Sequence, residues 1–231
     1  MVRTVGAGST FHLAVVRFAG RECICKRLRM RLLDEPKARS VLRREALALD
    51  LLRLDSVPEL LERGEDDRGP YVVQSRLAGA TLRELVDGFH ERGREVPSSL
   101  VRLVAERSFR ALAELHGLRG EEGPLDLVHG DLAPDHVLLD TDGKVSFADF
   151  GLSRWRGMSE VAEPNELGSL PFVAPELARG DHVPDQSCDV FALAGSIAFL
   201  ALGREPCAGT TPAARLVEVS EQGLDLSLIH I

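Results

Sequence analysis

The sequence has no long hydrophobic run, no signal peptide and no excess of positive charge. Its longest apolar stretch, Val190–Leu202, has 13 residues, too few for a helix to cross a bilayer, and suits a helix buried on all sides. The net charge of −8 over 231 residues argues against a nucleic-acid backbone or an anionic membrane surface as the main partner. We therefore expect no nucleic-acid partner and no membrane segment.

Cysteine is scarce, and its spacing does not suit zinc. Cys23 and Cys25 lie two residues apart in a predicted strand, which puts both on one face, and the other two are Cys188 and Cys207. No second Cys/His pair lies at zinc-binding spacing. We interpret all four thiols as reduced and mostly buried, which predicts a reducing compartment and a cytoplasmic location.

The most informative stretch is residues 127–151. Two short apolar runs, Val137–Leu139 and Val145–Phe147, flank a turn that contains Asp142-Gly143. An Asp-Gly pair between such runs predicts a β-hairpin, because both central residues of the tight turn need positive φ. Asp131 precedes this hairpin and Asp149 follows it, so both carboxylates can face one cleft. One could accept a proton from a hydroxyl while the other binds a hard cation.

The N-terminal part predicts a sheet and one helix. Runs 13–18 and 22–28 read as strands around Ala19-Gly20, and alternation puts Ile24 and Lys26 on one face. Leucines recur at helical spacing over 36–54, with Pro36 in the first turn. Glu45 shares the leucine face of that helix. Because a charge on an apolar face needs a buried counter-ion, we expect Glu45 to pair with Lys26.

Further elements are predicted downstream. Tyr71–Leu77 reads as a strand, Thr81-Leu-Arg-Glu84 has the capping-box pattern of a helix start, and 98–116 has helical leucine spacing.

Together these motifs resemble the protein-kinase-like superfamily, and bacterial eukaryotic-like serine/threonine protein kinases in particular. His129-Gly130-Asp131 stands where that family has His-Arg-Asp, and Asp149-Phe150-Gly151 is its metal-binding triplet unchanged. The resemblance implies an α+β, two-lobed protein-kinase-like fold. A small antiparallel β-sheet lobe would cover residues 1–77, and a mainly helical lobe would cover residues 78–225.

The resemblance also implies ATP and Mg²⁺ as cofactors and a protein with Ser or Thr as the acceptor. The catalytic residues that it implies are Asp131 as the base, Lys26, Glu45 and Ser169. The metal ligands that it implies are Asp149 and His136. The ATP-binding residues that it implies are Gly6, Ala7, Gly8, Leu13, Ile24, Lys26, Ser75, Leu77 and Leu138.

Several positions depart from the family pattern. Phe11 stands in place of the third glycine of the phosphate loop, and Ile24 in place of an alanine beneath the adenine. Gly130 replaces the arginine that reads a phosphate on the activation segment, which implies activity without that phosphorylation. Ala133 replaces a lysine that steadies the γ-phosphate. His136 replaces a metal-binding asparagine, and a histidine bonded to the loop backbone is an equal alternative to metal ligation there.

The segment from Asp149 to Ala174-Pro175-Glu176 resembles an activation segment, and Asp189 would cap backbone amides of the catalytic loop. Family resemblance ends near residue 210, so we expect a C-terminally truncated chain. The last residues, 226–231, match the translation of a transposon adapter used in sequencing libraries.

Three functions remain open from the sequence. A serine/threonine protein kinase fits the activation segment, because Ser169 matches the threonine of alcohol-specific enzymes. A pseudokinase acting as a nucleotide-binding scaffold fits the catalytic-loop substitutions. A carbohydrate or small-molecule kinase fits the Asp131–His136 spacing, which is similar to that of lipopolysaccharide-core sugar kinases.

Overall fold

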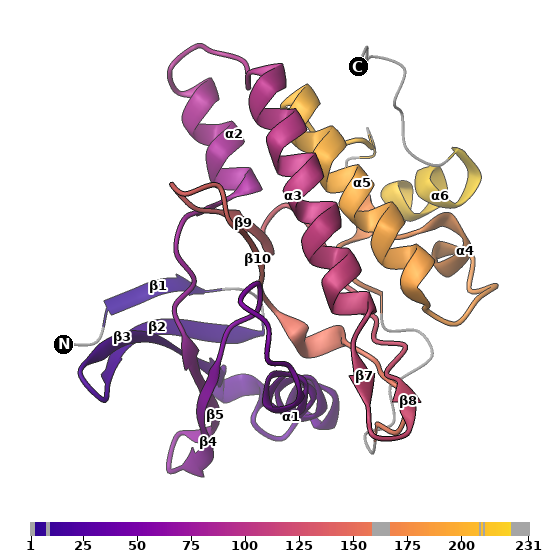
Figure 1. Ribbon diagram of the computed structural model, residues 1–231. Helices are drawn as coiled ribbons and strands as arrows, with labels where there is room; N and C mark the ends of the chain where they lie inside the picture. Colours follow the sequence, from indigo (N-terminus) through magenta and orange to yellow (C-terminus); the bar gives the residue numbers. More distant parts are fainter. Residues whose placement is uncertain (1–2, 8–9, 159–166, 208, 210, 223–231) are drawn as a thin grey trace. The chain divides into compact units, whose positions relative to one another are not determined.

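Figure 1 shows the computed structural model, which describes residues 3–7, 10–158, 167–207, 209 and 211–222. The chain divides into two compact units. The first contains residues 1–77 together with 149–151, and the second contains residues 78–148 and 152–231. The predicted adapter-derived tail, 226–231, lies outside the described residues, as does Gly8.

The first unit is an antiparallel sheet with one long helix. Its strand order is β1-β2-β3-β5-β4 in the residues described. The strands are β1 (Arg3–Ala7), β2 (Phe11–Phe18), β3 (Arg21–Leu28), β4 (Leu60–Asp66) and β5 (Gly69–Ser75). Helix α1 (Pro36–Leu51) packs against β3, β4 and β5, and a 3₁₀ turn, Met30–Leu32, precedes it (Figure 1). The antiparallel sheet predicted for this part of the chain is confirmed.

The β2–β3 hairpin turns at the dipeptide that the sequence indicated. Ala19 has φ 46° and Gly20 has φ 82°, so both central residues adopt the left-handed conformation of a tight hairpin turn. The pairing Leu13–Lys26 and Val15–Ile24 puts these four side chains on one face of the sheet. The cysteines of β3 lie on the opposite face.

Helix α1 begins at Pro36 as predicted but ends at Leu51, three residues before the expected end. Leu52 is already extended, with ψ 131°, and its side chain is buried. Arg53 Nη1 donates to the carbonyl oxygens of Leu49 and Leu52, so a side chain closes the helix. Strand β5 is shifted relative to the predicted 71–77, because Ser75 Oγ accepts the Glu59 N–H and ends the ladder.

The second unit is mainly helical, as the sequence predicted. Its helices are α2 (Leu82–His90), α3 (Ser98–His116), α4 (Pro175–Ala178), α5 (Gln186–Leu202) and α6 (Pro212–Gln222). Its short strands are β6 (Ala80–Thr81), β7 (Arg119–Gly120), β8 (Gly123–Pro124), β9 (Val137–Leu139) and β10 (Val145–Phe147). Short 3₁₀ turns are found at Phe150–Leu152 and Leu170–Phe172. The capping box at Thr81 and Glu84 is present and starts α2.

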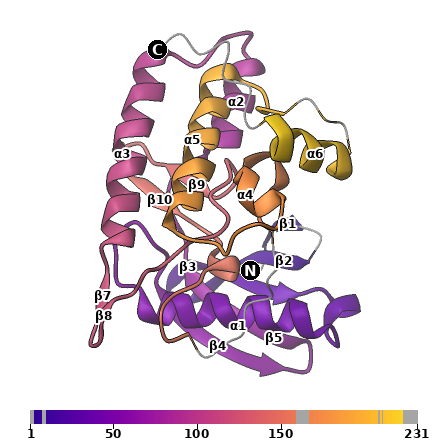
Figure 2. The same ribbon diagram turned by 90° about the vertical axis from the view of Figure 1, so that its right-hand side faces the viewer.

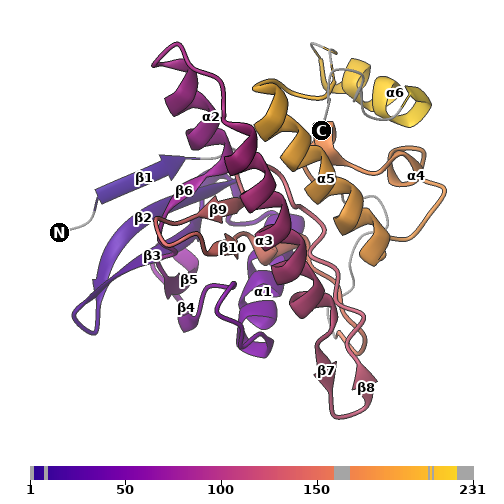
Figure 3. The ribbon, with the colours of Figure 1, turned by 45° about the horizontal axis from the view of Figure 1, so that its top comes forward.

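Helices α3 and α5 run side by side and form the centre of this unit (Figures 2 and 3). Leu193 and Leu200 of α5 are fully buried. The expectation that this helix is buried on all sides is wrong, because Val190 is 46% exposed and Ala194, one turn later, is also exposed. Most of α5 is therefore buried, but a stripe that includes Val190 and Ala194 is exposed to solvent. Among the helices of the described residues, none combines the length and apolar content needed to cross a membrane.

The β9–β10 hairpin is present, but its turn differs from the prediction. Leu139 pairs with Val145, which leaves residues 140–144 between the strands. Only Gly143 has positive φ there, at 78°. Asp140 Oδ1 accepts the N–H groups of Asp142 and Lys144 and so holds the longer turn.

The four cysteines are free and buried, which confirms their predicted state. Cys23, Cys25 and Val73 form an apolar cluster on one face of the sheet. Burial raises the pKa of the Cys25 and Cys188 thiols, and it raises the pKa of Cys207 to about 11.

We expect the Cys207 thiol to resist alkylation in the native protein. At pH 8 a pKa of about 11 leaves about one thiol in a thousand ionised, against about one in ten at the ordinary value of 9.0. Iodoacetamide labelling followed by peptide mass spectrometry should show slow native labelling that accelerates as the pH approaches 11, and fast labelling in guanidinium. Because the unfolded thiol loses its proton first, the same shift should lower stability between about pH 9 and 11. Fast labelling of native Cys207 at pH 8 would contradict the prediction.

Candidate active site

A buried ionic cluster lies in the first unit. Lys26 of β3 places Nζ 2.7 Å from Glu45 Oε2 and 2.8 Å from Asp149 Oδ1. The side chains of Lys26 and Glu45 are 4% and 1% exposed, whereas that of Asp149 is 34% exposed. The pairing of Lys26 with Glu45 expected from the sequence is therefore present.

The surroundings keep the Lys26 ammonium protonated. Burial lowers the pKa of Lys26, but the attraction of Asp149 and of Glu45 outweighs it, and the net result is a pKa well above the usual value. A permanent cation at this depth is suited to hold an anionic group.

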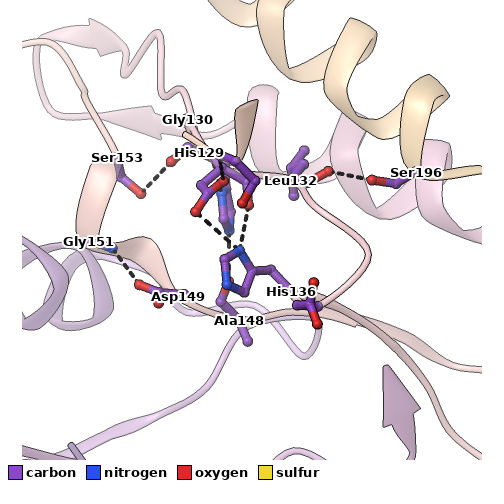
Figure 4. A network of polar contacts seen from close by, with 12 residues as sticks. His129, Gly130, Leu132, His136, Ala148, Asp149, Gly151, Ser153 and Ser196 are labelled. Atoms are coloured by element: carbon purple, nitrogen blue, oxygen red, sulfur yellow. Dashed lines mark hydrogen bonds and ion pairs between the residues drawn. The ribbon is translucent and has the colours of Figure 1, made fainter. Parts of the chain in front are cut away.

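Asp149 has a constrained backbone. Its φ is 64°, in the left-handed region that non-glycine residues rarely adopt, and its Oδ1 also accepts the Gly151 N–H at 3.3 Å (Figure 4). A Cβ on Gly151 would lie 2.6 Å from Val41 Cγ1 of α1, so only glycine fits there. Residues far apart in the sequence thus hold the Asp149 carboxylate beside Lys26.

The carboxylate of Asp149 fits a magnesium ion held together with phosphates. Among the residues that the structure describes, no group of three or more His, Cys, Asp or Glu side chains is arranged as a metal cage. Mg²⁺ commonly binds one or two carboxylates and completes its shell with substrate phosphates and water. A partly exposed carboxylate beside a buried ammonium meets that requirement.

The residues predicted to bind ATP lie in both units. Gly6 and Ala7 are in β1, Leu13 pairs with Lys26, and Ile24 pairs with Gln74. The Ser75 N–H donates to Glu59 O at 2.8 Å, so a contact of Ser75 with adenine would use its carbonyl oxygen. Leu77 follows β5 in the first unit, and Leu138 is on β9 in the second.

In the second unit, Asp189 of α5 anchors the loop that carries Asp131. Its Oδ2 accepts the His129 N–H at 2.7 Å and its Oδ1 accepts the Gly130 N–H at 2.9 Å. His116 Nε2 lies 2.9 Å from Asp189 Oδ2, and Asp189 is 1% exposed. The capping role predicted for Asp189 is confirmed.

Two serines support the same loop, as Figure 4 shows. Ser196 Oγ donates to Leu132 O at 2.7 Å, and Ser153 Oγ donates to His129 O at 3.3 Å. These contacts were not predicted from the sequence. The available signal was that Ser196 interrupts the apolar run Val190–Leu202.

Asp131 is held from two sides. Its Oδ1 accepts the Ser169 N–H at 2.7 Å. His136 Nδ1 lies 2.8 Å from the Asp131 carbonyl oxygen and 3.3 Å from Asp131 Oδ2. Ser169 therefore reaches the predicted catalytic carboxylate through its backbone amide, and His136 makes the backbone contact that was one of its two predicted roles.

Two glycines allow the chain to approach closely around Asp131. Gly130 has φ 83°, and a Cβ there would lie 2.7 Å from Leu152 O. A Cβ on Gly168 would lie 2.6 Å from Gly130 O and 2.7 Å from Asp131 Oδ1. From the sequence, Gly130 was interpreted only as a replaced arginine, and no contact of Gly168 with Asp131 was predicted. Beside this contact, a cavity of about 30 Å³ is lined by residues that include Asp131, Ser169 and Phe172, which is room for about one water.

Comparison with known proteins places these features in a family context. The family model of the protein kinase domain matches residues 2–227, so the expectation that the resemblance ends near residue 210 is wrong. A probable serine/threonine-protein kinase of Corynebacterium efficiens is 29% identical over 91% of this chain and 32% of its own length. Serine/threonine-protein kinase PknL of Mycobacterium tuberculosis is 30% identical over 84% of this chain and 42% of its own length. PrkC of Bacillus subtilis is 27% identical over 90% of this chain and 31% of its own length. The chain thus spans about a third to two-fifths of the curated relatives that it matches.

We expect Asp189→Ala to destabilise the second unit strongly. The change leaves the buried His129 N–H and the partly buried Gly130 N–H without their acceptor, each worth about 1–3 kcal/mol, so the free energy of unfolding should fall by about 2–6 kcal/mol. Asp185→Ala, which removes the exposed N-cap of the same helix, should cost about 1 kcal/mol. Urea denaturation of both variants provides the measurement. Equal losses would mean that Asp189 does not hold the loop.

Proposed function

Because the chain belongs to the protein kinase domain family, we propose that it transfers the γ-phosphate of ATP to a serine or threonine hydroxyl of a protein. The observation that carries the proposal is the buried cluster of Lys26, Glu45 and Asp149. Burying a lysine between two carboxylates costs desolvation energy. Such a costly arrangement is typical of a functional site, and phosphate binding is the function that suits a buried cation.

Each member of the cluster has a proposed task. Lys26, oriented by Glu45, binds the α- and β-phosphates, and Asp149 binds Mg²⁺ through its exposed carboxylate. Bound Mg²⁺ would neutralise phosphate charge during transfer. Asp131 accepts the proton of the acceptor hydroxyl, and the Ser169 N–H and His136 Nδ1 orient its carboxylate. We propose residues 1–77 as the nucleotide-binding lobe and residues 78–225 as the acceptor lobe.

The proposed activity does not depend on phosphorylation of the activation segment. Gly130 offers no guanidinium to read such a phosphate. Instead, Gly168 packs against Gly130 and the adjacent Ser169 N–H binds Asp131, which docks this part of the segment by backbone contacts. Ala133 lacks the positive charge that would steady the γ-phosphate, so we expect turnover about 10²–10³ below that of an enzyme with lysine there.

The setting of the reaction is also part of the proposal. The four free, buried cysteines and the use of ATP support a cytoplasmic location for this part of the chain. The net charge of −8 supports a protein acceptor and no nucleic-acid partner.

We expect Asp131→Asn to lower kcat by about 10²–10⁴-fold, because an amide cannot accept the hydroxyl proton. Asp149→Ala should abolish Mg²⁺-dependent turnover. Asp142→Asn, an equivalent change in the exposed β9–β10 turn, should leave activity unchanged. The measurement is transfer of labelled phosphate from ATP to a mixture of protein acceptors.

Each alternative function has its own outcome when ATP binding and transfer to sugar acceptors are measured beside that assay. ATP binding without transfer to any acceptor would indicate a pseudokinase. Transfer to sugars in preference to proteins, again lost in Asp149→Ala, would indicate a carbohydrate kinase. Unchanged turnover in Asp131→Asn would refute the proposed mechanism.

A second prediction concerns His136. Its contact with the Asp131 carbonyl supports a positioning role, and metal ligation would have to use Nε2. We expect His136→Ala to lower kcat by about tenfold, the equivalent of one hydrogen bond, without changing the Mg²⁺ concentration for half-maximal rate. His136→Asn, which can replace the hydrogen bond, should restore part of kcat. A several-fold rise in the Mg²⁺ requirement of His136→Ala would instead support the metal-ligand role.

A further inference from the structure

The ammonium of Lys26 has a third neighbour besides its two carboxylates. Its Nζ lies 4.4 Å from the centre of the Phe11 ring, in the geometry of a cation–π contact. Phe11 is the first residue of β2. In the kinase phosphate loops that this sequence resembles, the third glycine stands at the position of Phe11. The ring therefore covers the cation proposed to bind phosphate.

The sheet register places Phe11 on the same face as Lys26. Leu13 pairs with Lys26 and Phe11 pairs with Leu28, so Phe11 is the diagonal neighbour of Lys26 on the odd-numbered face of β2. The Lys26 side chain is only 4% exposed. Within the described part of the chain, Glu45, Asp149 and Phe11 surround Nζ, so a phosphate oxygen reaches Nζ only after one of them moves.

The ring is the neighbour that yields most easily. The two carboxylates carry full charges opposite a buried cation, whereas a cation–π contact changes an equilibrium constant by only about 2- to 30-fold. Phe11 also starts its strand, so its ring can turn away without breaking the centre of the β2–β3 ladder.

We propose that Phe11 is an aromatic gate on Lys26 that nucleotide phosphates must displace. This inference rests on the proposed nucleotide-binding function and deepens it, because it names the residue that sets affinity for the phosphate part of the ligand. The gate acts on ATP and ADP, and leaves adenosine unaffected because adenosine has no phosphate to compete for Nζ.

The test is calorimetric titration of the wild type and of Phe11→Ala with the non-hydrolysable analogue AMP-PNP, with ADP and with adenosine. Phe11→Ala should bind AMP-PNP and ADP about 2- to 30-fold more tightly than the wild type, with no change for adenosine. Phe11→Leu keeps apolar bulk but loses the ring face, and should show a smaller gain. It also keeps the proposal testable if alanine unfolds the strand.

Phe18→Ala is the matched control. Phe18 lies at the other end of β2 and packs against the Cys23–Cys25 cluster on the opposite face, so its loss should lower the melting temperature without tightening phosphate binding. In the double variant Phe11→Ala, Lys26→Met, the gain should disappear, because the cation that the ring covers is gone.

Two results would overturn the gate while leaving the proposed function in place. One is a wild type that binds AMP-PNP as tightly as, or more tightly than, both Phe11 variants. The other is an equal gain for adenosine, which would show a general change of the pocket. Failure of the wild type and both variants to bind any of the three ligands would overturn the gate and the proposed function together.

Discussion

One buried ammonium ties together the parts of the first unit. Lys26 links the centre of the sheet, through Glu45, to helix α1 and, through Asp149, to a segment more than a hundred residues later in the chain. That link is one reason why residues 149–151 belong to the first unit although their neighbours belong to the second. Removing one carboxylate from such a cluster leaves a buried charge short of a partner, which is costly. The fold of this unit and its proposed chemistry therefore depend on the same three side chains.

In the second unit a buried carboxylate has the corresponding role. Asp189 does not touch Asp131 itself but fixes the two residues before it, while Ser196 fixes the residue after it. The proposed base thus lies in a loop whose backbone is bonded to α5 on both sides. The Asp131 carboxylate also accepts a hydrogen bond from the Ser169 N–H. The loop and the segment that resembles an activation segment therefore meet at the proposed catalytic carboxylate.

Sequence patterns predicted the parts of this structure that follow from periodicity. Alternation in β3 and the leucine face of α1 were enough to pair Lys26 with Glu45, and the Thr81–Glu84 spacing was enough to start α2. Details that depend on one side chain bonding to nearby backbone could not be predicted in this way. The end of α1 depends on Arg53, and the length of the β9–β10 turn depends on Asp140. The ring of Phe11 lies over Lys26 only because the register of two strands brings them together, which composition and local pattern do not reveal.

The way Asp189 holds the catalytic loop bears on how this sequence can vary. The carboxylate binds main-chain N–H groups, which every residue except proline supplies, so this anchor does not itself use the side chains of residues 129 and 130. Residue 130 is nevertheless limited by its surroundings, because its φ is 83° and a Cβ there would lie 2.7 Å from Leu152 O. The hydrogen bonds that hold the loop of the proposed proton acceptor are thus made by the main chain, whereas a side chain at position 130 would decide how closely the loop meets Leu152.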